Sequence, residues 1–123
     1  LFAAWRWTRD PDGRAPQHQE REWRPLPRVV TVEVQNGGDQ AGAARDAALR
    51  LRQARLDVVY WGNAPEALRD TATTRTRVLV RAGDTTGVGR IAEVLGPIDL
   101  IDRPDPRRLV DLTVVIPRRP REP

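Results

Sequence analysis

Apolar positions recur between residues 29 and 116 with two periods, one of two residues and one of about 3.6 residues. Valine fills every second position from Val30 to Val34, which predicts a strand over residues 29–34 that stops at Asn36-Gly37-Gly38. The next apolar residues follow the helical period, and Asp39 is the predicted cap of that helix. They are Ala44, Ala47, Ala48, Leu51 and Ala54. Because most are alanine, we expect this helix to pack closely on a sheet.

A strand is also predicted over residues 76–81, where apolar and arginine residues alternate. Arg77, Leu79 and Arg81 share one side of this strand, and we expect that side to face solvent. The preceding connection, residues 64–74, has room for one helical turn but no longer period.

A second helix is predicted from Val88 to Leu95, with Asp84 as its cap and Gly96-Pro97 as its end. Further strands are predicted at residues 57–61, 98–101 and 109–116. The order β-α-β-β-α-β-β predicts an α/β (α+β) open-faced sandwich with two helices on one face of a mixed sheet of four or five strands. We expect the ferredoxin-like split β-α-β topology.

The formal charge of +4 comes from the two ends of the chain. Residues 1–28 carry six Arg against four acids and residues 118–123 carry three against one, whereas the domain between them, residues 29–117, is neutral. The first 28 residues are rich in proline and have no apolar period, so we expect an extended arm. This arm holds the only Phe and three of the four Trp, which predicts contact with a partner outside the domain. Its predicted partner-binding residues are Phe2, Trp5, Arg6, Trp7, Trp23 and Arg24.

The first residues, Leu1–Ala4, precede Trp5-Arg6-Trp7. That arrangement is typical of a membrane anchor leaving the bilayer, and an ordinary apolar start is the alternative. No run here approaches the ~18 apolar residues of a spanning helix, so we expect any anchor to lie upstream of Leu1.

Catalytic chemistry finds little support in the composition. There is no Cys and no Lys, and the single His18 lies in the arm, which argues against thiolate, lysine and triad mechanisms. The glycines of residues 83–90 lack the lysine of a phosphate loop, and the acids of residues 99–105 lack the spacing of a calcium loop. We therefore expect no catalytic residue, no metal and no cofactor.

Nucleic-acid binding is not expected, although the sequence pI is near 11.0. The basic residues that cause it lie in the tails, and the predicted sheet lacks the paired aromatics of RNA-binding sheets. Tyr60 and Trp61 are adjacent and must point to opposite faces. We expect one ring under the helices and the other on the open face or its rim.

Several short motifs agree in order and spacing with one known family. They are the strand that ends in Asn36-Gly37-Gly38, the glycine-started alanine helix, Asp57-Val58-Val59 before Gly62-Asn63-Ala64, and the closing Asp111–Ile116. Over about residues 29–116 the chain resembles the LytR C-terminal domain family, an extracytoplasmic module associated with LytR/CpsA/Psr proteins. The family often has glycine where this chain has Arg55-Leu56, so the first helix must end without it.

The resemblance implies a bacterial cell-envelope module without catalytic residues. Asn36 and Asn63 would serve turns through side-chain to backbone bonds, with ligand contact as the alternative. These two residues and Trp61 are the candidate contacts on the domain itself.

Two functions remain open. One is a non-catalytic scaffold or accessory subunit, anchored at the extracytoplasmic (periplasmic) face of the inner membrane, that docks on subunits of a larger membrane protein complex through its arm. An energy-transducing or photosynthetic assembly is one conceivable host. The other is a module that binds peptidoglycan or another wall glycan.

Overall fold

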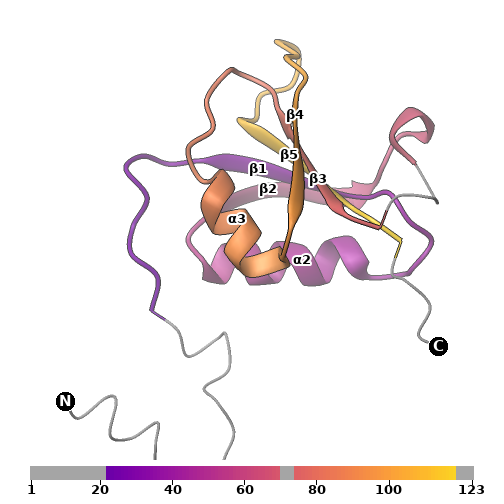
Figure 1. Cartoon of the computed structure of the whole chain (residues 1–123), viewed down its shortest axis with the longest axis horizontal. Coiled ribbons are helices and arrows are strands. Elements are labelled where there is room, and N and C mark those ends of the chain that lie inside the picture. The colour runs from indigo at the N-terminus through magenta and orange to yellow at the C-terminus, as the bar shows by residue number, and fades with distance from the viewer. Residues whose placement is uncertain (1–21, 70–73, 119–123) are drawn as a thin grey trace, which may run out of the picture.

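The computed structural model describes residues 22–69 and 74–118, which form a five-stranded mixed sheet with two helices on one face (Figure 1). The elements are β1 (Thr31–Asn36), α2 (Ala43–Gln53), β2 (Asp57–Asn63), the 3-10 turn η2 (Glu66–Leu68), β3 (Thr76–Val80), α3 (Val88–Leu95), β4 (Ile98–Asp102) and β5 (Leu112–Ile116). The predicted α+β class and element order are confirmed. Among these helices, none is both long and apolar enough to cross a membrane.

The strands lie in the order β2-β1-β5-β3-β4. Each β-α-β unit joins neighbouring parallel strands, β1 with β2 and β3 with β4, so the predicted split β-α-β topology is wrong. The last strand, β5, lies between the units, parallel to β1 and antiparallel to β3. Residues Leu112 to Val115 are all buried, so β5 is apolar enough on both faces to occupy the centre of the sheet.

The two units run in opposite directions and wind outward from β5 toward opposite edges. A right-handed crossover in each therefore places both helices on the same face of the sheet. Helix-facing valines of β1, alanines of α2 and Ile91 and Val94 of α3 fill the space between the layers. Small residues on α2 permit the close approach that the sequence predicted.

The opposite face of β3 is not solvent-exposed, which corrects the expectation for Leu79 and Arg81. Leu79 is 1% exposed and Arg81 is 7% exposed. The connection after β4 lies against Arg81: Arg81 Nη1 donates to the Arg103 carbonyl at 3.0 Å, and Asp105 N donates to the Arg81 carbonyl at 3.1 Å. A period of two specifies the two faces of a strand but not which loops cover them.

A buried polar cluster forms under this connection. Arg81 Nε donates to Thr113 Oγ1 at 2.9 Å, and Thr113 Oγ1 donates to Glu33 Oε1 at 3.0 Å. Arg108 donates to the same carboxylate oxygen at 2.6 Å. Arg108 forms an ion pair with Glu33, and Arg81 is held by hydrogen bonds to Thr113 and the Arg103 carbonyl, so each buried charge has polar partners that lower the cost of its burial.

Neither predicted aspartate caps its helix. Gly42 and Gly87, both in the left-handed conformation, occupy the N-cap positions of α2 and α3, with no side-chain cap bond at either. Asp84 instead accepts hydrogen bonds from the amide and hydroxyl of Thr86, two residues before the helix. The chain enters both helices through a glycine turn, which a search for polar caps overlooks.

Candidate functional site

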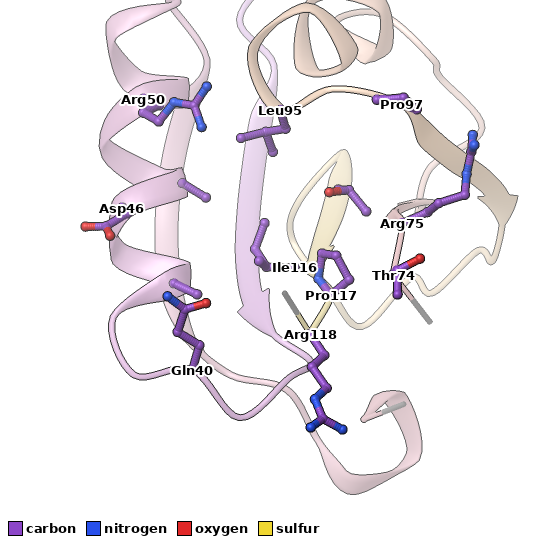
Figure 2. A pocket seen from close by; sticks show the side chains of 13 residues that line it. Gln40, Asp46, Arg50, Thr74, Arg75, Leu95, Pro97, Ile116, Pro117 and Arg118 are labelled. Carbon is purple, nitrogen blue, oxygen red and sulfur yellow. The ribbon is translucent and has the colours of Figure 1, made fainter. Parts of the chain in front are cut away.

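A cleft of about 360 Å³ lies between α2 and the carboxyl end of β5 (Figure 2). Figure 2 shows Leu95 and Ile116 between α2 and the start of β3, with Arg50 at one end and Gln40 and Arg118 at the other. The remaining lining residues are Ala43, Asp46, Ala47, Thr74, Arg75, Thr76, Pro97 and Pro117. The cleft has an apolar floor and a polar rim.

Alanine on α2 opens this cleft. Ala43 and Ala47 are one turn apart on the side of α2 that faces the strand ends, so their small side chains leave space there. Leu95 is the last residue of α3, because Gly96 with φ 89° and Pro97 end the helix. Ile116 is the last residue of β5, and Pro117 follows it.

The rim of the cleft is mainly cationic. Arg50 donates to the Val94 carbonyl, and Arg75 donates to Asp99 Oδ1 at 2.8 Å. Arg118 forms no ion pair with the residues that the structure describes, and Figure 2 shows Asp46 pointing away from the cleft. The arrangement suits an anionic or strongly polar ligand that also buries apolar surface.

A second feature is the clamp, by which we mean residues 23–28 and their contacts with the domain. Trp23 is 9% exposed and lies in the hydrophobic core, with Leu26 packed beside it. The guanidinium of Arg90, in α3, lies 5.2 Å from the centroid of the Trp23 ring. A cation placed over an indole face is attracted to it.

Arg28 completes the clamp with two carboxylates. Its Nε donates to Asp84 Oδ2 at 2.8 Å, and its Nη2 donates to Asp111 Oδ1 at 3.1 Å. The hydroxyl and amide of Thr86, followed by Arg28, lower the pKa of Asp84 from 3.8 to about 2. Burial raises the pKa of Asp111, but hydrogen bonds from Arg28 and Thr31 outweigh it and lower the pKa overall. Both carboxylates therefore stay ionised opposite Arg28 at neutral pH.

The predicted arm residues fall into two groups. Phe2, Trp5, Arg6 and Trp7 lie outside the described residues. Trp23 was expected in an arm outside the core, which is wrong, since its ring is part of the core. Arg24 is exposed. The packed unit thus starts upstream of residue 29.

Asn36 serves the turn expected of it. Its Oδ1 accepts from Gly38 N at 3.1 Å, and its Nδ2 donates to the Gln40 carbonyl at 2.7 Å. The side chain is buried, so it has no surface for a ligand. Asn63 pairs with Asn36 in register at the end of β2 and is exposed.

Trp61 lies at the helix side of the β2 edge, where the Arg52 guanidinium is 4.9 Å from its ring centroid. It is 37% exposed, and Tyr60 is 53% exposed. The expectation that one of these rings is buried under the helices is therefore wrong. The reason is that β2 is an edge strand, whose side chains are covered from one direction only.

Sequence reasoning missed the arginines of the cleft. Arg50 follows Ala47 by three residues and so lies on the alanine side of α2, a signal that the helical period contains. Arg75 and Arg118 come to the cleft only through the pairing of β3 with β5, which no local pattern shows. Among the described residues, no group of three or more His, Asp or Glu is placed to hold a metal.

The fold and the site together define a small two-helix α+β domain with a cationic cleft. The model of the family described as LytR cell envelope-related transcriptional attenuator matches residues 29–118, and the chain belongs to this family of LytR C-terminal domains. The predicted family is confirmed, and with it an association with the extracytoplasmic cell envelope.

The chain is similar to the solution structure of the C-terminal domain of RV0431. The two are 22% identical with a TM-score of 0.46, over 85% of this chain and 83% of that chain. No curated protein sequence matches the chain.

Proposed function

We propose that this chain is a non-catalytic accessory domain of the cell envelope, which docks on a membrane protein assembly through the residues upstream of its clamp. The observation that carries this proposal is the clamp itself. Trp23 in the core and Arg28 between Asp84 and Asp111 fix the point at which the arm leaves the domain. A partner bound to the arm would therefore hold the domain in a defined position, as a scaffold requires.

The residues that would make the contact are Phe2, Trp5, Arg6 and Trp7. Tryptophan and arginine supply a large share of binding energy at protein interfaces. An arm restricted by proline and fixed at one end also loses less conformational entropy on docking than a free chain. An inner-membrane anchor upstream of Leu1 belongs to the same proposal, whereas no observation argues for an energy-transducing or photosynthetic host.

The absence of catalysis is part of the proposal. The most buried carboxylate, Glu33, already accepts hydrogen bonds from Gln35, Thr113 and Arg108. All three bonds are accepted by Oε1, so this carboxylate serves to support the fold.

The test is co-purification of the native protein from solubilised membranes, with the Trp5→Ala/Trp7→Ala double variant beside it. We expect stoichiometric partners with the native chain and their loss with the double variant, at unchanged unfolding free energy. Leu109→Ala is the matched control, since Leu109 is 89% exposed in the connection before β5. Equal retention of partners by the double variant would contradict docking through the arm.

A second candidate function is supported by the cleft. Its three arginines and its apolar floor favour a segment of an anionic wall polymer as ligand. Arg118→Glu should then weaken retention on purified cell wall, and Arg107→Glu, an exposed change of equal charge, should not. Equal retention of the two variants would rule out the cleft as the polymer site.

A further inference from the structure

The two edges of the sheet differ in how they are protected. The β4 edge carries Asp99 and Asp102, and Arg75 donates to the Ile98 carbonyl at 2.9 Å. Charges of this kind blunt an edge strand against pairing with another chain. In β2, by contrast, the only charged residue is Asp57, at its first position, and the strand pairs with β1 alone among the described strands.

Apolar side chains are exposed along this second edge. Val59 is 52% exposed, Tyr60 53%, Trp61 37%, and Leu49 of the adjoining α2 is 39% exposed. Arg45 and Arg52 flank Leu49 on the same side of α2, one turn on either side of it. These six residues are referred to below as the β2-edge surface. Tryptophan, tyrosine and arginine are the residue types enriched at interface hot spots.

Arg52 organises the surface from within. It donates to the Val58 carbonyl through Nε at 3.2 Å and Nη2 at 2.7 Å, and its guanidinium lies over Trp61. Val59 is the extra residue of a β-bulge, since Val32 and Glu33 pair with Val58 and Tyr60. Regular pairing with β1 resumes at Tyr60 and runs to Asn63. The outer backbone of this stretch is where another strand would pair.

Charge decides between the possible occupants. Arg45, Arg52 and Arg55 lie on or beside this edge, against the single acid Asp57. Suppose that two copies paired through β2 about a two-fold axis perpendicular to the sheet. Their α2 helices would then lie on the same face of the joined sheet, and the arginines of one α2 would face those of the other. A second copy is therefore disfavoured, and an acidic strand is favoured.

We infer that the β2-edge surface binds an extended acidic segment of a partner protein, which adds as a strand beside Tyr60–Asn63. Its backbone would pair with the outer edge of β2. Acidic side chains at alternate positions would meet the arginines on the helix side, and the apolar side chains between them would meet Tyr60 on the opposite face. This inference rests on the proposed accessory function and names a second contact point, distinct from the arm.

The probe is a synthetic peptide of alternating Glu and Val, titrated into the ¹⁵N-labelled full chain, with a Lys and Val peptide of equal length as control. We expect amide shift changes centred on Val59, Trp61 and Asn63 with the acidic peptide and none with the basic one. Changes confined to Thr74, Arg75 and Arg118, or no changes at all, would overturn the inference.

Two variants with the same change in net charge test the role of the arginines. Arg45→Glu places an acid in the first turn of α2, where the helix dipole favours it, so the variant should fold. We expect it to weaken binding of the acidic peptide about fivefold, whereas Arg107→Glu, with the same change in net charge, leaves binding unchanged. Equal weakening by both variants would show a non-specific charge effect and overturn the inference.

Sedimentation of the full chain tests whether a second copy of the chain occupies the β2-edge surface. A monomer across the concentrations used for NMR supports a heterologous partner. A dimer that Trp61→Ala abolishes would assign the surface to a second copy and overturn the inference. If the acidic peptide fails while membrane partners still depend on Trp5 and Trp7, the inference is wrong and the proposed function stands.

Discussion

At the scale of single residues, the Asn36-Gly37-Gly38 turn is held by both a side-chain and a backbone hydrogen bond. Asn36 closes the turn with its side chain, and Gly37 N donates to the Ile116 carbonyl at 2.9 Å. The glycines are needed for space, because the end of β5 crosses directly over them. A Cβ on Gly38 would lie 2.8 Å from Arg118 Cα and 2.9 Å from Arg118 N.

Gly38→Ala should therefore destabilise the protein. Both close atoms belong to the backbone, which cannot move aside like a flexible side chain, so we expect a loss of about 1–3 kcal/mol. Urea unfolding measures it. Gly89→Ala is the control, because a Cβ there meets nothing within 4 Å. Gly89 lies inside α3, so alanine should stabilise the protein by about 0.5–1 kcal/mol. A neutral Gly38→Ala would mean that the crossing is looser than described.

At the scale of elements, the ends of the helices depart from the simplest sequence rules. The end of α2 matches the sequence expectation that it lacks a glycine, and Arg55 takes the left-handed conformation instead, with φ 69°. Leu56 N donates to the Leu51 carbonyl at 3.1 Å, as in a Schellman motif. This arginine therefore holds a conformation that L-residues adopt only at a cost.

Arg55→Gly should stabilise the protein. Glycine adopts a positive φ without the steric penalty, which exceeds the extra entropy that glycine loses on folding, so we expect a gain of about 0.5–1 kcal/mol. Thermal and urea unfolding provide the measurement. Arg45→Gly removes the same side chain from the first turn of α2, where the backbone has ordinary helical geometry, and should cost up to about 1 kcal/mol. A loss of stability in Arg55→Gly would show that the arginine side chain contributes more than its backbone costs.

At the scale of the whole molecule, two long-range arrangements define the domain. The first is the insertion of β5 between the two β-α-β units, which joins them into one sheet. The second is the clamp, which adds Trp23 to the core and links Arg28 to the carboxylates of Asp84 and Asp111. The folded unit thus includes a segment that its composition assigns to the arm.

Trp23→Ala should lower the free energy of unfolding of the full chain by about 3 kcal/mol or more, the usual cost of removing a buried tryptophan. Arg24→Ala, at the exposed neighbouring position, should change it by less than about 0.5 kcal/mol. A chain of residues 29–118 should still unfold cooperatively, because the rest of the core remains, but at a lower urea midpoint than residues 22–118. Equal urea midpoints for the two chains would show that Trp23 does not stabilise the core and belongs to the arm.

Local pattern was sufficient for the elements. Alternating valines specify β1, alanines at helical spacing specify α2, and Gly96-Pro97 ends α3, because each depends on interactions within a few residues. The family could be recognised for the same reason, since its motifs are turns and strand ends such as Asn36-Gly37-Gly38.

Long-range pairing decided the rest. Three features depend on which distant segment covers an element: the central position of β5, the burial of Arg81 and Leu79, and the position of Trp23 in the core. No local period contains that information. The cleft and the β2-edge surface have the same origin. The sequence alone determined what each segment is, and the tertiary structure decided which segments meet, because burial depends on neighbours distant in the chain.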